Sequence, residues 1–566
     1  MKKLCFLILS CLCFFIYNAS AQSFSVVNLG PGYGTGSYPY GMTTFNGKVY
    51  FEADPDTMKG YELYASDGTV AGTSLIKDIN PGPGHSYPNN FIAMGNQLFF
   101  AADDGVHGTE LWVTDGTSSG TVMLDDIWPG PTGGLSGGPF FTVLNGKLYF
   151  VADDSVHGAE LWVSDGTPSG TSLVKDIFPG TSSSNIYGVG AGNGYGLETY
   201  KYSLTEWNGK LYFEANDGIH GGELWATDGT TAGTTMIADI WTGPGTSFPY
   251  CITAFGNMLV MGATDSLHGT ELWVSDGTAG GTSLLKDIYP GLSSSLPGDY
   301  ATLNLFNGKL YFDATTPANG DELWVTDGTS AGTQLVADIW PGPTSSTPGL
   351  LGIVVYNNKM YLNANDSLNG DQLWTSDGTA AGTTLLKVLS NYTPNYSRPE
   401  AFMQFDGKMV FIANTDSINL EQLFISDGTA GGTHVISPAI APNGNPLGYY
   451  PDFCVLNNSL FMDADFNSVR HQLWVYGFPL GITPVSGDNT ITAYPNPFST
   501  SVTLSGVDPS QHYTVEVLDM SGRVYYNAQY DPSETIVVSM PDLTSGVYLM
   551  HVSGQGSTQT FKLVRN

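Results

Sequence analysis

The spacing Asp-x-x-His-x-x-Glu, seen at Asp154, His157 and Glu160, is the pattern in this sequence that most directly suggests chemistry. Carboxylate and imidazole groups are suitable metal ligands. The histidine recurs in comparable loops, but asparagine replaces it in later ones, at Asn319, Asn369 and Asn419. Asparagine is a poor substitute for a metal-binding imidazole, whereas both residue types tolerate left-handed turn conformations. The pattern therefore predicts a turn rather than a transition-metal site.

The same loops are acidic, so calcium remains a possible ligand of these loops. Calcium prefers carboxylate and carbonyl oxygens and is bound by many extracellular proteins. The candidate ligands are the loop aspartates Asp104, Asp154, Asp217 and Asp265. No other cofactor is expected.

Catalytic motifs are not evident in the sequence. We find no nucleophile motif, phosphate-binding loop, cysteine–histidine cluster or singular carboxylate pair that stands out from the repeat background. An enzyme that is built from repeats usually breaks the repeat pattern at one site, where its catalytic residues lie. We therefore expect a protein that is not an enzyme and has no catalytic residues.

Aromatic residues supply the candidate ligand-binding positions. Connecting segments such as DIWPGPT carry Trp128, Trp241 and Trp340, and an insertion at residues 188–202 carries Tyr195 and Tyr200. The tryptophans could stack on sugar rings or fill the gaps between structural units. Insertions in repeat arrays often lie on the binding face, but this one could equally be a loop without a role. Both alternatives stay open.

These residues belong to a repeat of about 50 residues. The phrase ELWVTDGTSSGT at Glu110–Thr121 recurs in eight units, and a decayed ninth copy lies at His471–Gly477. One unit contains four strand-like runs, with Asn145-Gly146 as a hairpin turn between the first two. The aspartate and glycine of DGT suit another turn, so we assign that motif a structural role.

The second and third strands of the unit are apolar on both faces, as in KLYFVA at residues 147–152. Such strands belong to a sheet that is covered on both sides. The ninth unit lacks a fourth strand, and residues 24–32 match the missing pattern. We predict an all-β closed β-propeller of about nine four-stranded blades over residues 22–485, in which the N-terminal strand completes the last blade.

The repeats resemble the bacterial family named for its own motif, ELWxxDGTxxGT, over about residues 24–476. Departures from the motif include Tyr64 and Phe424 in place of tryptophan. The resemblance implies a secreted or surface protein of undefined activity.

The composition changes near residue 487, and we place a second domain at residues 486–566. Its short alternating strands predict a small immunoglobulin-like β-sandwich. Its ordered motifs are similar to those of the type A C-terminal sorting domain of the type IX secretion system. The resemblance implies that the secretion machinery is a partner. After cleavage of the tail, the protein could be either released or attached to surface lipopolysaccharide. The residues that it marks as sorting determinants are Tyr494, Pro495, Asn496, Pro497, Gly522, Gly546, Tyr548 and Lys562.

The N-terminus and the net charge agree with export. Residues 1–21 have the basic start, apolar run and small-residue end of a secretory signal peptide. No later stretch approaches the roughly 20 apolar residues of a transmembrane segment. The formal net charge of −33 argues against nucleic acid as a partner. We expect a location outside the cell or on the outer-membrane surface, reached through the periplasm.

Three functions follow from these observations. The first is a non-enzymatic role in adhesion, glycan binding or protein interaction on the propeller surface. The alternatives are a secreted polysaccharide-degrading enzyme with a propeller active site and a structural component of a surface layer.

Overall fold

The structure is a computed structural model of the whole chain. It describes residues 23–27, 29, 36–55, 58–135, 141–186, 204–390, 397–415, 421–438, 447, 452–466, 471–477, 492–494, 500–505, 507–519, 523–533, 535–540, 543–544, 546–554 and 557–565. Phe24–Gly477 form one compact unit, and Phe478–Asn566 belong to a second. Among the described residues, no helix has the length and apolar character that crossing a membrane requires.

The first unit is built from four-stranded sheets that follow one another along the chain. Sheet 1 contains β2 (Tyr40–Phe45), β3 (Lys48–Ala53), β4 (Glu62–Ser66) and β5 (Ser74–Lys77). Sheet 2 contains β6 (Asn89–Met94), β7 (Gln97–Asp103), β8 (Thr109–Thr114) and β9 (Val122–Asp125). Sheet 3 contains β10 (Thr142–Leu144), β11 (Lys147–Asp153), β12 (Ala159–Ser164) and β13 (Ser172–Lys175). Sheet 4 contains β14 (Thr205–Trp207), β15 (Lys210–Asn216), β16 (Gly222–Thr227) and β17 (Thr235–Ala238).

The series continues with the same order of strands. Sheet 5 contains β18 (Tyr250–Phe255), β19 (Met258–Asp265), β20 (Gly269–Ser275) and β21 (Ser283–Lys286). Sheet 6 contains β22 (Asn304–Phe306), β23 (Lys309–Thr316), β24 (Gly320–Thr326) and β25 (Gln334–Ala337). Sheet 7 contains β26 (Ile353–Tyr356), β27 (Lys359–Asp366), β28 (Gly370–Ser376) and β29 (Thr384–Lys387). Sheet 8 contains β30 (Glu400–Phe405), β31 (Lys408–Asn414), β32 (Glu421–Ser426) and β33 (His434–Val435).

Sheet 9 joins the two ends of this unit. It contains β34 (Phe453–Leu456), β35 (Ser459–Ala464) and β36 (Gln472–Gly477), and its fourth strand is β1 (Ser23–Val27) beside β36. Val27 of β1 packs in one core with Val49 of sheet 1 and Phe461 of sheet 9. The backbone N–H of Ser37 also donates to the carbonyl of His471 at 2.8 Å. Sheet 9 therefore packs against sheet 1.

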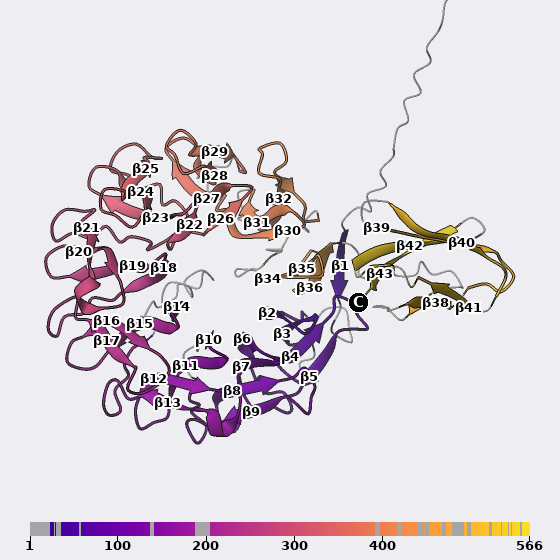
Figure 1. Cartoon of the computed structure of the whole chain (residues 1–566), viewed down its shortest axis with the longest axis horizontal. Coiled ribbons are helices and arrows are strands. Elements are labelled where there is room, and N and C mark those ends of the chain that lie inside the picture. The colour runs from indigo at the N-terminus through magenta and orange to yellow at the C-terminus, as the bar shows by residue number, and fades with distance from the viewer. Residues whose placement is uncertain are drawn as a thin grey trace, which may run out of the picture. The chain divides into compact units, whose positions relative to one another are not determined.

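Figure 1 shows the sheets of this unit arranged around a central space, a propeller-like arrangement. The first strand of each of sheets 1–8 faces the centre, and the fourth lies at the periphery. Within sheet 3, β11 and β12 are antiparallel with Phe150 opposite Trp162. Phe150 and Trp162 pack against sheet 2, whereas Leu161 packs toward sheet 4. Burial on both faces explains why these strands are apolar at every position.

Turn chemistry fixes the register of each sheet. Asn145 and Gly146 have φ of 51° and 72°, as the tight hairpin turn between β10 and β11 requires. Short 3₁₀ helices, η1 (Pro168–Gly170) and η3 (Ala279–Gly281), follow two of the DGT turns. Lys175 links neighbouring sheets, because its Nζ donates to the carbonyl oxygen of Thr234 at 2.7 Å. Cys251 and Cys454 are buried free thiols.

The second unit has a sheet of β37 (Thr492–Tyr494), β38 (Ser501–Ser505) and β41 (Thr535–Ser539). Its other sheet orders β40 (Val524–Tyr530), β39 (Tyr513–Asp519), β42 (Gly546–Gly554) and β43 (Ser557–Arg565). Apolar residues of both sheets share one core, which includes Val502, Leu504, Val515, Val517, Ile536, Val538 and Met550. The unit is thus a small β-sandwich.

Candidate functional site: an aromatic stripe between sheets

The glutamate of each ELW phrase is buried and fixes the connection to the next sheet. In sheet 4, Oε2 of Glu223 accepts hydrogen bonds from the N–H of Ile240 at 2.7 Å and the hydroxyl of Ser247 at 2.7 Å. Its Oε1 accepts from the N–H groups of Trp241 at 3.4 Å and Ser247 at 3.2 Å. Burial raises the pKa of Glu223 to about 7, although these hydrogen bonds oppose the shift. The glutamate therefore organises the chain that leads into the next inner strand.

The serine bound by this glutamate opens a Ser-Xaa-Pro segment that recurs at the sheet boundaries. In six copies the serine is fully buried and donates its hydroxyl hydrogen to the ELW glutamate or its glutamine replacement: Ser37, Ser86, Ser247, Ser295, Ser346 and Ser397. The proline is also buried in each copy. We call the central residue the junction residue. The junction residues are Tyr38, Tyr87, Phe248, Leu296, Thr347 and Arg398.

All six junction residues have φ between 43° and 51°. This left-handed conformation costs an L-residue about 1–2 kcal/mol, and a following proline disfavours it further. It persists because the serine and proline on either side are held in place. Strained residues of this kind cluster at binding and catalytic sites. Four of the six side chains are exposed large hydrophobic groups, namely Tyr38, Tyr87, Phe248 and Leu296.

Two of the junction residues form an aromatic stripe with residues from the preceding sheets. The stripe consists of Tyr38, Tyr61, His85, Tyr87 and His471. Tyr38 stacks on His471 with ring centroids 5.7 Å apart, and Tyr87 stacks on Tyr61 at 5.5 Å. His85 lies 5.4 Å from Tyr61 and 5.1 Å from Tyr87. The side chains of Tyr38 and Tyr87 are 37% and 50% exposed, so the stripe presents ring surface to solvent.

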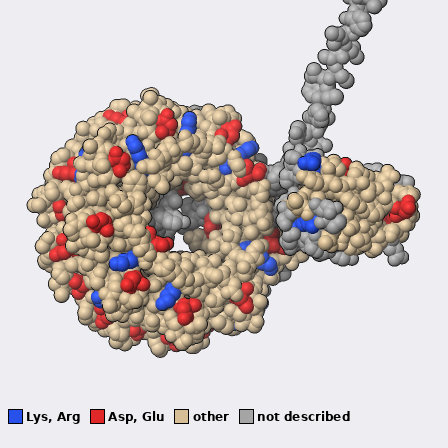
Figure 2. Space-filling model, viewed as in Figure 1, with Lys and Arg blue, Asp and Glu red and all other residues tan. Residues whose placement is uncertain are grey.

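Acidic groups lie beside the stripe. Burial raises the pKa of Tyr61 most, and with the smaller effects of Glu52, Asp54, Tyr38 and Tyr87 the pKa reaches about 12. The pKa of Glu52 is raised to about 8 by burial and by Asp452. Buried titratable carboxyl groups therefore lie close to the exposed aromatic rings. Figure 2 shows that acidic side chains are scattered over the visible face of the repeat unit, with fewer basic ones among them.

At the other end of the stripe, His471 is paired with a carboxylate. Its Nδ1 lies 2.9 Å from Oδ2 of Asp463. Burial is the largest effect and lowers the pKa of His471, but Asp463 and Asp465 together raise it, and the net shift is upward. This pair fixes the imidazole plane on which Tyr38 stacks.

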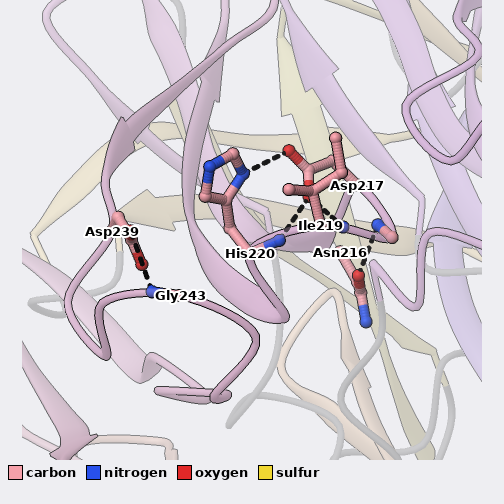
Figure 3. Close-up of polar contacts among 7 residues, drawn as sticks. Asn216, Asp217, Ile219, His220, Asp239 and Gly243 are labelled. Carbon is pink, nitrogen blue, oxygen red and sulfur yellow. Dashed lines mark hydrogen bonds and ion pairs between the residues drawn. The ribbon is translucent and has the colours of Figure 1, made fainter.

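The aspartates proposed for calcium lie in closed turns. In sheet 4, Oδ1 of Asp217 accepts from the N–H groups of Ile219 and His220, both at 2.8 Å, and Oδ2 lies 2.7 Å from Nδ1 of His220 (Figure 3). Asp104, Asp154 and Asp265 make the same contacts with their own histidines. Both carboxylate oxygens are already engaged, which does not suit inner-sphere calcium. Within the described ranges, no group of three or more His, Cys, Asp or Glu side chains is placed to hold a metal ion.

The histidines of these turns act through their side chains rather than their backbone. In sheet 2, positive φ occurs at Gly105 and Gly108, not at His107. The expectation that histidine is chosen for a left-handed conformation is therefore wrong. In sheet 7, Nδ2 of Asn369 donates to Oδ2 of Asp366 at 2.8 Å. In sheet 6, Nδ2 of Asn319 donates to Oδ2 of the connector residue Asp338 at 2.9 Å, so both asparagines bind a carboxylate through their side chains.

The DGT motif forms a hydrogen-bonded turn. Oδ1 of Asp276 accepts from the N–H of Thr278 at 3.0 Å and from its hydroxyl at 2.6 Å. The N–H of Gly281 donates to the same hydroxyl oxygen at 3.1 Å. A Cβ atom on Gly281 would lie 2.0 Å from the Asp276 carboxylate, so glycine is required. These contacts give the motif a structural role.

The connector tryptophans Trp128, Trp241 and Trp340 are half-buried and lie in separate connectors, so the structure does not gather them into one site. A Cβ on Gly245 would lie 2.2 Å from the ring of Trp241, so that ring packs on its own connector. Phe178, the aromatic at the equivalent position in sheet 3, packs on Gly218 of sheet 4. Tyr195 and Tyr200 lie outside the described residues.

Several sorting determinants also lie outside the described residues, namely Pro495, Asn496, Pro497 and Gly522. Tyr494 belongs to β37 and Lys562 to β43, and Gly546 begins β42. The side chain of Tyr548 is buried in the sandwich core.

One buried carboxyl pair departs from the repeat. Asp313 and Asp321 of sheet 6 are 1% and 4% exposed, and burial raises the pKa of both. Sheet 7 has Asn363 and Asp371 at these positions, joined by a 3.2 Å hydrogen bond. Because Asp313 and Asp321 are both inaccessible, they cannot contact a polysaccharide in this conformation.

The residues of the aromatic stripe lie outside the repeated phrases of the sequence, and so the motifs did not predict them. A signal for it does exist. Ser-Tyr-Pro occurs at Ser37–Pro39 and again at Ser86–Pro88, and Tyr61 precedes the ELW glutamate where other units have small or polar residues. Comparison of the units at their variable positions would have identified these tyrosines.

Solved structures offer only distant likenesses. One, from work on two prolyl endopeptidases, is 10% identical with a TM-score of 0.39, covering 77% of this chain and 55% of the other. Prolyl oligopeptidase B from Galerina marginata is 12% identical with a TM-score of 0.35, covering 68% and 55%. Oligopeptidase B from Leishmania major is 9% identical with a TM-score of 0.36, covering 69% and 55%. The chain thus spans little more than half the length of these structures, and they assign no activity to it.

No curated protein matches the chain in sequence. Residues 492–566 match the family model of the secretion system C-terminal sorting domain. This match confirms the sorting domain expected from the tail motifs. The domain directs export by the type IX secretion system to the cell surface or the extracellular space, and it implies contact with that machinery.

Proposed function

We propose that the repeat unit is a closed nine-bladed propeller whose function is non-enzymatic binding of a saccharide at the aromatic stripe. The exported protein would act in adhesion or glycan binding outside the cell. The observation that carries the proposal is the pair of stacked tyrosines Tyr61 and Tyr87, with exposed ring surface held by a strained, buried Ser-Xaa-Pro segment.

The chemistry of a sugar ring suits this surface. Aromatic rings offer a flat apolar face to the C–H groups of a pyranose, and tyrosine hydroxyls can bond to sugar hydroxyls. Rings that are already fixed by stacking lose little conformational entropy on binding. Both properties are present in the stripe, because each exposed tyrosine packs on a ring of the preceding sheet.

The stripe also departs from the repeat, as a specific site should. Other junction residues are Leu296, Thr347 and Arg398, which offer no aromatic face. Phe248 is exposed, but Gly222 precedes the ELW glutamate beneath it and supplies no ring to stack on. Among the described junctions, two neighbouring ones therefore combine an aromatic junction residue with an aromatic ring below it.

The experiment is binding of the purified protein to a broad glycan array, with calcium and with a chelator. The proposal expects saturable binding that is lost in Tyr87→Ala and kept in Leu296→Ala, which changes a junction residue outside the stripe. Thermal unfolding of both variants establishes that they fold. If the folded wild-type protein binds no glycan on the array, the proposal is contradicted. Binding that is lost with the chelator supports a calcium requirement.

A further inference from the structure

Two buried carboxyl groups of sheet 6, Asp313 on β23 and Asp321 on β24, lie on the same face of the sheet. Asp313 is paired with Leu323 and Asp321 with Thr315, so the two aspartates are diagonal neighbours across the strands. Diagonal side chains of an antiparallel pair are close enough to interact. Both residues are more than nine-tenths buried. The two carboxyl groups therefore face the same buried region.

The hydrogen bonds of the two carboxyl groups are unequal. Oδ1 of Asp313 accepts from the N–H of Ala301 at 2.7 Å, and Oδ2 accepts from the N–H of Tyr300 at 3.2 Å. Asp321 has no such donors, because both of its carboxyl oxygens are buried and lack a hydrogen-bond partner among the described residues. A buried polar group without a partner is rare in a folded protein and points to a bound ion or water.

Sheet 7 satisfies the same two positions with its own side chains. Asn363 and Asp371 occupy them, and Nδ2 of Asn363 donates to Oδ1 of Asp371 at 3.2 Å. Oδ1 of Asn363 accepts from the N–H of Leu351 at 3.0 Å, the same kind of contact that anchors the first carboxyl group of sheet 6. Burial raises the pKa of Asp371 to about 6, and the junction residue Arg398 opposes that shift. An amide and a guanidinium therefore balance one carboxylate.

Sheet 6 has neither of these balancing groups. Aspartate stands in place of the asparagine, and the junction residue is Thr347, whose side chain carries no charge. The charged groups that act on Asp321 are all acidic, namely Asp313, Glu322 and Asp299. Burial of unpaired carboxylates is strongly unfavourable. The pair therefore requires positive charge from outside the chain.

We propose that Asp313 and Asp321 together bind one calcium ion inside the repeat unit. A divalent cation matches the charge of two carboxylates, whereas a monovalent cation leaves half of it uncompensated. Calcium is coordinated by oxygen atoms alone and accepts carboxylates together with backbone carbonyls and water. Unlike Asp217, whose oxygens are engaged in its own turn, Asp321 has both oxygens free of hydrogen bonds.

The site is small and independent of the aromatic stripe. Within the described ranges no three His, Cys, Asp or Glu side chains gather around a metal position, so carbonyl oxygens and water would complete the coordination of the two carboxylates. Sheet 6 contributes no residue to the stripe. The inference therefore stands whether or not the protein binds a saccharide.

Thermal unfolding of the full-length protein, first dialysed against a chelator, tests the inference. The melting temperature is compared in chelator, in calcium and in magnesium. We expect calcium to raise it by about 3 °C, because an ion that binds only the folded state adds stability. Magnesium should raise it by less than about 1 °C, since this ion retains its water and demands octahedral geometry. Atomic emission after gel filtration should detect calcium retained by the protein.

Variants locate the effect. Asp313→Asn reproduces the arrangement of sheet 7, so it should fold, lose the calcium-dependent rise and retain no calcium. In chelator it should melt at or above the wild-type temperature, because one buried charge is gone. Asp321→Asn should lose the rise as well. The matched control is Glu214→Gln: Glu214 is a buried carboxyl group at the equivalent position of sheet 4, where Gly222 replaces the second aspartate. This control should keep the full rise.

A wild-type melting temperature that does not respond to calcium overturns the inference and indicates that protons neutralise the pair. An equal rise in wild type and Asp313→Asn also overturns it, because calcium would then act elsewhere on this acidic chain. Loss of the rise in Glu214→Gln does the same. If Asp313→Asn does not fold, Asp321→Asn decides by the same two readouts, the melting temperature and the retained calcium.

Discussion

Ser247 donates its hydroxyl hydrogen to the buried carboxyl group of Glu223, with 2.7 Å between Oγ and Oε2. The two residues are 24 positions apart. Glu223 lies in β16 of sheet 4 and Ser247 in the connector that leads to β18 of sheet 5, so the bond ties one unit to the next. Equivalent bonds occur at Ser86 and Ser346. The strained junction residue follows this serine directly, so the bond holds the backbone on its N-terminal side.

Loss of an ELW glutamate should destabilise the repeat unit. Glu271 accepts hydrogen bonds from the N–H groups of Ile288, Tyr289 and Ser295 and from the Ser295 hydroxyl. Glu271→Ala leaves these buried donors without an acceptor and should lower the free energy of unfolding by about 3 kcal/mol. Glu271→Gln should cost less than half of that, because Gln372 fills the same role in sheet 7. Urea denaturation measures both, and equal losses in the two variants would contradict the account.

The same glutamates predict how stability depends on pH. Burial raises the pKa of Glu62, Glu110, Glu160, Glu223, Glu271 and Glu322 to about 7. The folded protein therefore binds more protons than the unfolded chain between about pH 4.5 and pH 7. The stability that comes from these protons is lost as pH rises through that window. We expect the urea midpoint to fall from pH 5 to pH 8, with a smaller fall in Glu271→Gln. A midpoint that rises over this range would show that the carboxylates are ionised in the fold.

Relief of backbone strain should stabilise a junction that lies outside the aromatic stripe. Thr347 has φ of 47°, an unfavourable value for a β-branched residue. Thr347→Gly should raise the free energy of unfolding by about 1 kcal/mol, because glycine adopts this conformation freely. Thr344→Gly is the control, since Thr344 is an exposed threonine without positive φ and should gain nothing. A loss of stability in Thr347→Gly would mean that its side chain contributes more than the strain costs.

The packing of β1 between sheets 9 and 1 can be tested with two adjacent residues. Val27 is 2% exposed in the core shared by sheets 1 and 9, whereas its neighbour Val26 is 36% exposed. Val27→Asp places a charge in that core and should lower the free energy of unfolding by about 3 kcal/mol. Val26→Asp should change it by less than about 0.5 kcal/mol. Similar effects in the two variants would argue against the packing of β1 on sheet 1.

The sequence predicted the elements that depend on local pattern. The Asn145-Gly146 hairpin turn and the doubly apolar strands β11 and β12 follow from turn chemistry and alternation, which short segments determine. The N-terminal strand was expected beside the last unit, and β1 lies next to β36. The tail motifs predicted the sorting domain that the family match confirms.

The contacts that build the candidate site join residues far apart in the chain, and local pattern does not reveal them. Tyr38 stacks on His471 where sheet 9 contacts sheet 1, and Glu62 accepts a hydrogen bond from Ser86 of the next unit. The role of the ELW glutamate thus depends on which connector segment folds back onto it. Trp128 and Trp241 recur in a conspicuous connector motif, whereas the tyrosines of the stripe lie at variable positions of the repeat.

The most direct test compares the aromatic stripe with the connector tryptophans in one binding measurement. The ligand is the saccharide that binds most tightly on the array, titrated into wild type, Tyr61→Ala with Tyr87→Ala, and a triple variant of Trp128, Trp241 and Trp340 to Ala. The account predicts a loss of affinity of at least about tenfold in the tyrosine variant and less than about threefold in the tryptophan variant, with both folded. The opposite result, unchanged affinity without the tyrosines and lost affinity without the tryptophans, would contradict the assignment of the site to the aromatic stripe.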